Sequence, residues 1–249
     1  MRPLLAAIRF LTVLPIPGNY ATGEEELARS LAFFPVVGLL IGGAAAALAY
    51  GLGFVAPPPV AAALVVVFLL KVSRGLHLDG LADTMDAFMS SRDRERMLAI
   101  MKDTHVGAMG VIAIASVLLL KTLSLASLEG GAFWRGALLA PVAGRAALVF
   151  GMALLPYVRP QGGLGTVFYQ GRPRVAGLAA LVLLLAAGWL AAGLAGVFAA
   201  LFSMAGVALF AGYCHAKIGG ATGDTLGASC EMAETWTLLF MSAWFYATG

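Results

Sequence analysis

Long apolar runs dominate this sequence and decide what the chain can fold into. Its 249 residues are 61% hydrophobic and 12% charged, with a mean hydropathy of +0.91, outside the range of ordinary soluble domains. A membrane-spanning helix needs about 20 mostly apolar residues. Such runs lie at 31–54, 57–72, 107–126, 133–155, 174–192, 194–213 and 233–248. We therefore expect an all-α, polytopic membrane bundle, a single domain over residues 1–249 with six or seven transmembrane helices and amphipathic helices on the cytoplasmic side.

The N-terminal segment MRPLLAAIRFLTVLP differs from a signal peptide, because Arg9 interrupts a short apolar run and no small-residue cleavage site follows. We expect it to form an interfacial helix. The two cysteines, Cys214 and Cys230, are too few for a disulfide framework and lie outside any CxxC pair. They carry no prediction of redox chemistry.

The basic residues are distributed unevenly between the two sides of the predicted bundle. Numbering the spans in order places segments 1–30, 71–106, 156–174 and 214–232 on one side. That side holds 13 of the 16 Lys and Arg: Arg2, Arg9, Arg29, Lys71, Arg74, Arg92, Arg94, Arg96, Lys102, Arg159, Arg172, Arg174 and Lys217. Lys121 and Arg135 fall on the other side, and Arg145 falls within a span. The positive-inside rule makes the polar side cytoplasmic.

Three aspartates lie close together in the segment GLHLDGLADTMDAF, residues 75–88. On a helix, Asp83 and Asp86 lie about 40° and about −20° around the axis from Asp79, so the three carboxylates share one ridge. Carboxylates at this spacing repel one another and need a nearby cation. An acidic face in contact with water is the alternative. Oxygen ligands favour a hard divalent cation, and Mg²⁺ commonly uses one or two carboxylates with substrate phosphates.

The segment GGATGDTLGASCEMAE, residues 219–234, combines four glycines with Asp224, Glu231 and Glu234. Glycines allow a backbone to approach an anion closely, and Asp224 adds a fourth candidate metal ligand. The pattern is neither a Rossmann fingerprint nor a P-loop, because no strand precedes it and no Gly-Lys-Ser/Thr ends it. A flexible hinge is the alternative interpretation.

Two further polar segments fall on the same side. The segment GLGTVFYQGRPR, residues 163–174, offers Arg172 and Arg174 to a phosphate, although both also fit as ordinary positive-inside anchors. In SSRDRERMLAIMKDTHVGAMG, residues 90–110, Ser90 with Asp93 predicts a helix cap and the three arginines predict a solvated face. Asp103 is an acid just before a span, so it needs a partner.

Two more residues are notable for their positions. His77 points about 160° away from Asp79 on an ideal helix, which disfavours it as a shared metal ligand unless the helix begins later, near Gly80. Arg145 lies inside an apolar run. It should therefore face the bundle interior and pair with a carboxylate or a substrate phosphate.

Six motifs in order resemble those of the cobalamin synthase family, adenosylcobinamide-GDP ribazoletransferase. They are FLTVLPIPG, FFPVVGLLIG, HLDGLADTMDA, IMKDTHVGAMG, GLGTVFYQG and GGATGDTLGASCEMAE, and they extend from about residue 10 to residue 234. The resemblance implies the last step of nucleotide-loop assembly in cobalamin biosynthesis. In that step α-ribazole, or its 5′-phosphate, displaces GMP from adenosylcobinamide-GDP and gives adenosylcobalamin or its phosphate. It also implies a Mg²⁺ requirement and a place in the bacterial inner membrane.

The resemblance and the residue patterns together assign roles. The expected Mg²⁺ ligands are Asp79, Asp83, Asp86 and Asp224. Asp86 or Asp103 is expected to accept the proton of the attacking ribose hydroxyl. The expected substrate contacts are His77, Lys102, His105, Arg145, Arg172, Gly220, Gly223 and Thr225. The expected partners are the two small-molecule substrates and the lipid bilayer, and not nucleic acid; self-association and contacts with other enzymes of cobalamin assembly are left open.

Two other functions compete with this prediction. A cation-coupled transporter also carries intramembrane acids, but near the midplane of repeated halves, and this sequence has no internal repeat. A lipid-headgroup transferase would share the metal and the phosphates, but the spacing D-x2-D-G-x2-A-R is absent. Release of GMP separates all three functions.

Overall fold

The computed structural model describes residues 2–16, 23–159, 164–170 and 172–248, and within these residues it contains helices, turns and one isolated bridge but no strand. Pro17, Gly18, Gly163 and Gly171, from the motifs above, lie outside the described residues. The elements are α1 (Arg2–Leu11), α2 (Glu24–Ser30), the 3-10 helix η1 (Leu31–Phe33), α3 (Phe34–Leu52), α4 (Pro58–Val72), α5 (Leu76–Phe88), α6 (Arg94–Ile100), α7 (Ala108–Ala126), α8 (Gly131–Leu154), α9 (Leu164–Tyr169), α10 (Pro173–Ile218) and α11 (Gly223–Thr248). The predicted all-α class is confirmed.

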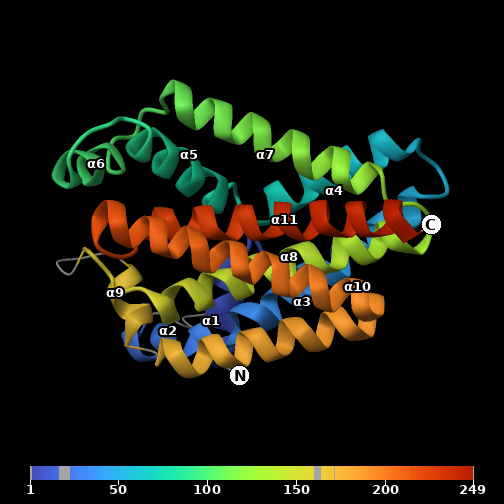
Figure 1. Cartoon of the computed structure of the whole chain (residues 1–249). Helices are drawn as coiled ribbons and strands as arrows, with labels where there is room; N and C mark the ends of the chain where they lie inside the picture. Colours follow the sequence, from blue (N-terminus) through green and yellow to red (C-terminus); the bar gives the residue numbers. More distant parts are fainter. Residues whose placement is uncertain (1, 17–22, 160–163, 171, 249) are drawn as a thin grey trace.

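The long helices run side by side along one axis. Figure 1 shows α3, α4, α7, α8, α10 and α11 along the length of the molecule, with α8 and α11 in its centre, while α2, α5, α6 and α9 gather at one end. Small residues allow α8 to pack closely: a Cβ on Gly38 of α3 would lie 2.8 Å from the carbonyl oxygen of Pro141. This close backbone approach through glycine is typical of helices packed in membranes.

The 46-residue element α10 is two helices joined by a sharp turn. Gly193 has φ 59° and ψ −135°, a conformation outside the helical region that suits only glycine. A Cβ on Gly188 would lie 2.6 Å from the carbonyl oxygen of Gly196, so the two arms fold back on each other. The break predicted between spans 174–192 and 194–213 is therefore present.

Among the described residues, four helices are long and apolar enough to cross a membrane, or five if the bent pair α4 and α5 forms one span, so the predicted count of six or seven is not confirmed. Three features explain the difference. α10 counts once although it turns back at Gly193. The predicted span 57–72 is the 15-residue α4, which turns by 89° into α5. The predicted span 233–248 belongs to the longer α11, which carries Asp224, Glu231 and Glu234 and is less apolar.

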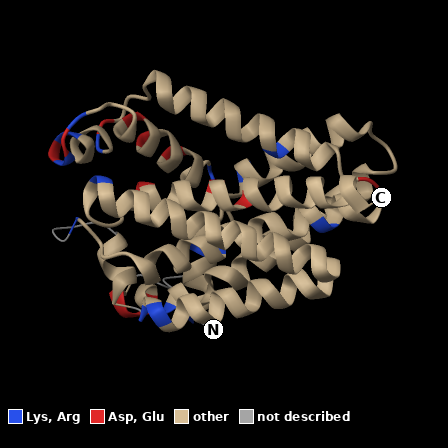
Figure 2. Cartoon of the chain, viewed as in Figure 1, with Lys and Arg blue, Asp and Glu red and all other residues tan. Residues whose placement is uncertain are grey.

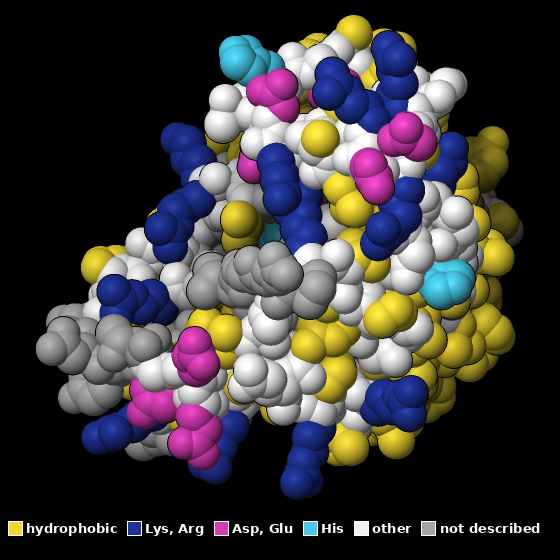
Figure 3. Space-filling model, turned by 90° about the vertical axis from the view of Figure 1, so that its left-hand side faces the viewer, with side chains coloured by type: hydrophobic (Ala, Val, Ile, Leu, Met, Phe, Trp, Pro, Cys, Tyr) yellow, Lys and Arg dark blue, Asp and Glu magenta, His cyan; other side chains and the backbone are white. Residues whose placement is uncertain are grey.

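Charged side chains gather at one end of the bundle. Figure 2 shows most Lys, Arg, Asp and Glu around α2, α5 and α6, and Figure 3 shows that end as a surface of mixed charge. The predicted cap of the basic segment is present in part. Asp93 Oδ1 accepts a hydrogen bond of 2.8 Å from the Arg96 amide at the start of α6, whereas Ser90, which was expected to share the cap, donates to Ala87 O at the end of α5. The predicted concentration of polar groups at one end is thus confirmed, with Lys121 as an exception described below.

Candidate active site

The aspartate ridge lies on α5, which begins after a sharp turn. Gly75 adopts φ +68°, in the left-handed region, and this turn separates α5 from α4. α5 buries Leu81 and Phe88 on its inner side. Asp79 is exposed, and Asp83 and Asp86 are half-buried, so the ridge faces outward as the helical spacing predicts.

The start of α11 packs directly on α5. A Cβ on Gly80 would lie 2.8 Å from the carbonyl oxygen of Asp224, and one on Gly227 would lie 3.3 Å from Cα of His77. Only glycine permits such an approach between helix backbones. Asp224 and the α5 aspartates, about 140 residues apart in sequence, are therefore neighbours, and the glycine-rich segment forms a helix start rather than a separate hinge.

Their proximity has an electrostatic consequence at Asp83. Partial burial, together with the carboxylates of Asp79, Asp224 and Asp86, raises the pKa of Asp83 from 3.8 to about 6, against a smaller opposing effect of Arg159. Negative charge at this end of α5 is therefore only partly compensated by the protein. A cation or a cationic group of a ligand would offset it.

We call Asp79, Asp83 and Asp224 the acidic cluster. Arg159 forms an ion pair with Asp224 of this cluster. Val158 N donates to Ala221 O at 3.0 Å and Ala221 N donates to Pro156 O at 2.8 Å, so the segment after α8 is tied to the segment before α11. Arg159 Nη2 consequently lies 3.2 Å from Asp224 Oδ2. Nε and Nη2 of Arg159 are buried and have no hydrogen-bond partner within the described residues, so the ion pair is not aligned as a hydrogen bond. The Arg159 side chain is 21% exposed, which leaves part of the guanidinium open to an anionic ligand.

A cavity of about 250 Å³ lies beside these residues. Its polar lining comprises His77, Asp79, Tyr157, Arg159 and Asp224, and its apolar lining comprises Phe10, Phe34, Leu76, Leu148, Met152, Phe168 and Leu226. Gly80, Gly165, Gly223 and Gly227 complete the wall and expose backbone to it. The cavity thus brings together residues from both ends of the chain, and it is the best candidate for a substrate site.

Of the predicted substrate contacts, His77 and Gly223 line this cavity, and Gly223 has open space at its Cβ position. Gly220 instead allows contact with Pro156 O, and Thr225 Oγ1 is engaged with Thr222 N at 2.9 Å and Thr222 O at 3.1 Å. These two residues shape the start of α11. Lys102, His105 and Arg172 are exposed and do not line the cavity.

The two candidate general bases have protein partners. Asp86 accepts hydrogen bonds from Gly107 N at 2.7 Å and Gly110 N at 2.8 Å, and so caps the start of α7 from a different helix. Asp103 lies 2.6 Å from His105 Nδ1. This hydrogen bond lowers the pKa of Asp103 and raises that of His105. Neither carboxylate lines the cavity.

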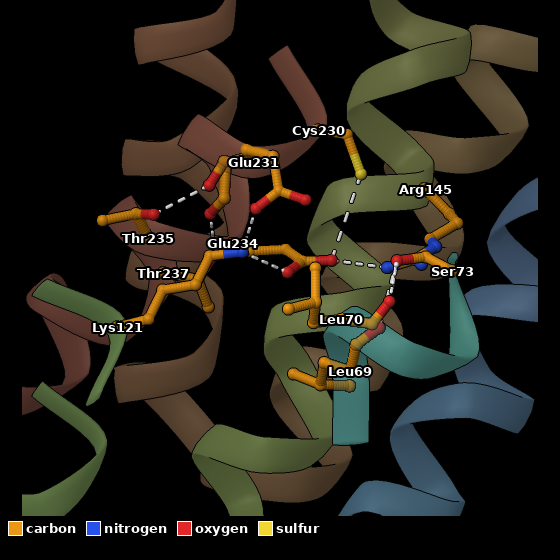
Figure 4. A network of polar contacts seen from close by, with 11 residues as sticks. Leu69, Leu70, Ser73, Lys121, Arg145, Cys230, Glu231, Glu234, Thr235 and Thr237 are labelled. Atoms are coloured by element: carbon orange, nitrogen blue, oxygen red, sulfur yellow. Dashed lines mark hydrogen bonds and ion pairs between the residues drawn. The ribbon is translucent and has the colours of Figure 1, made fainter. Parts of the chain in front are cut away.

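Arg145 belongs to a buried network of ion pairs. Figure 4 shows Lys121 of α7 between Glu231 and Glu234 of α11, and Arg145 of α8 against Glu234. Lys121 Nζ lies 2.6 Å from each glutamate, and Arg145 Nη1 pairs with Glu234 Oε1. All four side chains are less than a tenth exposed. The prediction that Arg145 pairs inside the bundle with a carboxylate is confirmed.

The same network corrects the placement of three other residues. Lys121 was expected at the outer surface, and Glu231 and Glu234 in or just after a polar segment, but all three are buried inside the bundle. The reason is mutual neutralisation: burial of one charge is costly, whereas two cations facing two carboxylates can be buried together. We call Lys121, Arg145, Glu231 and Glu234 the buried ion network.

Sequence reasoning missed Arg159, Tyr157 and the phenylalanines of the cavity. Arg159 had a usable signal, because it is the single cation in the short segment 155–159 that follows α8. Phe10, Phe34 and Phe168 had none, since phenylalanine in an apolar chain is ordinary and their meeting depends on the tertiary fold.

A divalent cation fits the chemistry of the acidic cluster. Within the described residues, no three His, Cys, Asp or Glu side chains converge into a ready-made metal site. Asp79, Asp83 and Asp224 nevertheless offer only oxygen donors, and their repulsion is evident at Asp83. Mg²⁺ commonly takes one or two carboxylates and completes its shell with water and phosphate oxygens. The donor set is compatible with that mode.

Comparisons with known proteins place the chain in a family. Residues 3–242 match the family described as cobalamin-5-phosphate synthase. The adenosylcobinamide-GDP ribazoletransferase of Roseiflexus sp. is 42% identical over 93% of this chain and 86% of its own. The proteins of the same name from Desulforamulus reducens and Pseudomonas fluorescens are 39% and 42% identical, each over 96% of this chain and 95% and 98% of their own. No solved structure matches the chain. The chain therefore belongs to the cobalamin-5-phosphate synthase family of transferases.

Proposed function

We propose that the protein is an adenosylcobinamide-GDP ribazoletransferase, which joins adenosylcobinamide-GDP to α-ribazole or its 5′-phosphate and releases GMP. Relatives of this name match nearly the whole chain. The observation that supports the proposal best is the cavity between α5 and α11, where Asp79, Asp224 and Arg159 lie together. Carboxylates for a cation beside a guanidinium with unpaired N–H groups suit a diphosphate substrate.

In the proposed reaction a ribose hydroxyl oxygen forms a bond to the cobinamide-linked phosphorus, and the bond from that phosphorus to the bridging oxygen of the diphosphate breaks. GMP leaves with the bridging oxygen, and the hydroxyl proton passes to a carboxylate of the protein. Such a displacement depends on in-line positioning and on neutralising charge.

The positions of the aspartates and of Arg159 around the cavity suggest their roles in the reaction. Asp79, Asp83 and Asp224 form the centre of the Mg²⁺ site, and Asp86 joins it only through the lone pairs that its two backbone hydrogen bonds leave free. When bound there, Mg²⁺ supplies positive charge to the diphosphate. Arg159 binds a phosphate oxygen through the exposed part of its guanidinium. Asp86 and Asp103 are the two candidates for accepting the proton.

The direct test is release of GMP by the purified protein in liposomes. GMP should form only when adenosylcobinamide-GDP, α-ribazole and Mg²⁺ are all present, and the corrinoid product should contain the ribazole. GMP formed without an acceptor would indicate a hydrolase, and no GMP under any condition would reject the proposal.

The proposed location is the bacterial inner membrane, with the charged end facing the cytoplasm. The positive-inside rule supports this orientation, because that end carries Arg94 and Arg172 together with most other cations. Cysteines introduced at these two positions should stay unlabelled by an impermeant reagent added outside intact spheroplasts. Labelling from outside would reverse the orientation.

A further inference from the structure

The cavity has an aromatic wall that the proposed phosphate chemistry does not use. Phe10 of α1, Phe34 of α3 and Phe168 of α9 form one cluster, with ring centroids 4.9 to 5.8 Å apart. Phe34 and Phe168 are buried and support Phe10, which is half-buried. Leu148 and Met152 of α8 line the cavity beside this aromatic cluster. Part of the cavity therefore suits a flat apolar group rather than a phosphate.

The size of the cavity limits which part of the substrates can enter it. Its volume of about 250 Å³ is below the usual range for sites that enclose a drug-sized ligand, about 300–1,000 Å³. The corrin macrocycle with its amide side chains is far larger than such a ligand. The corrin must therefore remain outside, which leaves the two bicyclic bases, guanine and the benzimidazole of ribazole.

Polarity separates these two bases. Guanine carries several donors and acceptors on its edge, and burying them without partners is costly. The apolar lining, comprising the aromatic cluster with Leu148, Met152 and Leu226, offers no side-chain partners for them. A benzimidazole attached to ribose has one remaining polar ring atom, the nitrogen not bonded to the sugar. It needs a single hydrogen-bond donor.

His77 offers a candidate donor. The other donors that line the cavity, Tyr157 and Arg159, lie near Asp224, at the end assigned to the diphosphate. His77 is 3% exposed, lines the cavity, and has no hydrogen-bond partner at Nδ1 within the described residues. A buried polar atom left without a partner is unusual in a folded protein and calls for a specific explanation. With the imidazole turned toward the cavity, a ligand atom would satisfy it.

Resting on the proposed function, we propose that this cavity is the acceptor subsite, which binds the benzimidazole base of ribazole against the aromatic cluster with its free ring nitrogen at His77. The ribose then lies toward Asp79, Asp224 and Arg159, where the diphosphate of the donor is bound. The guanosine and corrin parts of the donor lie outside the cavity.

The first test separates acceptor binding from donor binding. Phe10→Ala removes the half-buried ring and should weaken binding of α-ribazole about tenfold or more, as loss of an aromatic stacking partner does. The KM for adenosylcobinamide-GDP should stay within about twofold. Phe150→Ala is the matched control, because Phe150 is a half-buried phenylalanine on α8 between Leu148 and Met152 that does not line the cavity. Equal losses for donor and acceptor would overturn the proposal.

The second test addresses His77 with a matched pair of ligands. His77→Leu should weaken binding of α-ribazole about tenfold, the effect of one hydrogen bond to a buried group. It should leave unchanged the binding of the indole riboside with the same methyl groups, which lacks the ring nitrogen acceptor. A loss of the same size for both ligands would show that His77 only maintains the shape of the cavity, and would overturn its assignment as the donor.

Direct binding separates this inference from the proposed function. Equilibrium binding of α-ribazole to the wild-type protein in nanodiscs needs neither donor nor turnover. If GMP is released but Phe10→Ala binds α-ribazole as tightly as the wild type, the subsite is wrong and the function stands. If α-ribazole binds and depends on Phe10 while no GMP is released, the function is wrong and the subsite stands. Absence of binding at millimolar α-ribazole would overturn the subsite.

Discussion

Two groups of charges in this apolar protein differ in how they are balanced. The buried ion network sets two cations, Lys121 and Arg145, against two carboxylates, Glu231 and Glu234, with short contacts on every member. The acidic cluster at the end of the bundle comprises Asp79, Asp83 and Asp224, and Arg159 forms an ion pair with Asp224. The network is neutral by itself, whereas the cluster has a surplus of negative charge.

The difference indicates which group is structural and which binds ligands. A balanced network inside a bundle holds helices in one arrangement and needs nothing from outside. Unbalanced carboxylates beside a cavity lower their energy when a cation arrives, and such perturbed groups are frequent at functional sites. Substitutions in the two groups, and in the carboxylates Asp86 and Asp103 near the acidic end, test this difference through folding or activity.

The largest effect is expected when the buried ion network loses one cation. Lys121→Met leaves Glu231 without a counter-charge and should destabilise the folded protein by about 3–5 kcal/mol, as loss of one member of a buried pair does. Thermal unfolding in detergent measures it. Lys71→Met is the control, because Lys71 is exposed at the end of α4. Adding Glu231→Gln restores neutrality and should recover much of the stability; if it does not, the network is not held by charge balance.

The second prediction is a loss of activity without a loss of stability. Asp83→Asn should lower GMP release about 100-fold, in the range for removing one preorganised electrostatic group. The folded protein should be at least as stable as the wild type, because the change removes repulsion with Asp79 and Asp224. Glu95→Gln, an exposed acid on the start of α6, is the control. Wild-type turnover in Asp83→Asn at ordinary Mg²⁺ would make the cluster a solvated acidic face.

The third prediction tests whether Asp224 and Asp83 form one unit. Members of one catalytic group are strongly non-additive. Asp83→Asn combined with Asp224→Asn should therefore be little slower than the more damaging single variant, measured as kcat/KM. If the two losses in log rate add, Asp224 belongs to a separate structural element.

The comparison also shows what the sequence can predict. Helical spacing was enough to place Asp79, Asp83 and Asp86 on one ridge, and Arg145 was expected to pair inside the bundle, because a charge in an apolar run needs a partner. Lys121 was expected at the outer surface although it is buried inside the bundle, because it lies near the end of an apolar run and its partners Glu231 and Glu234 are about 110 residues away. A lysine near the end of a span looks the same in sequence whether it faces water or a buried acid.

The cavity could not be predicted from local patterns. Its aromatic cluster joins residues from α1, α3 and α9, and its Arg159 is brought to Asp224 by backbone contacts between residues 156–158 and 221. Long-range contacts of this kind depend on how the helices pack. The glycines of the 219–234 motif were correctly noticed, but Gly80 and Gly227 matter chiefly because they let α5 and α11 touch.

A smaller effect is expected at Asp86, where the structure adds a second role. Asp86→Asn keeps one acceptor oxygen but places an NH₂ group against the other backbone N–H, so the cap of α7 should weaken by about 1 kcal/mol. Thermal unfolding measures the cap, and GMP release measures any contribution to the Mg²⁺ site. Unchanged stability with activity lost as in Asp83→Asn would make Asp86 a ligand or base rather than a cap.

The smallest effect is expected at Asp103. Removing a true general base costs about 10²–10⁴-fold in rate, but Asp103 is solvent-exposed, bonded to His105 and outside the lining of the cavity. We therefore expect Asp103→Asn to lower kcat well short of 100-fold and to leave the acidic limb of the pH–rate profile in place. His105→Ala is the matched variant, since it removes only the partner and should have a similar small effect. A loss at Asp103 as large as that at Asp83, together with disappearance of the acidic limb, would assign the base to Asp103 and extend the active site from the cavity to the start of α7.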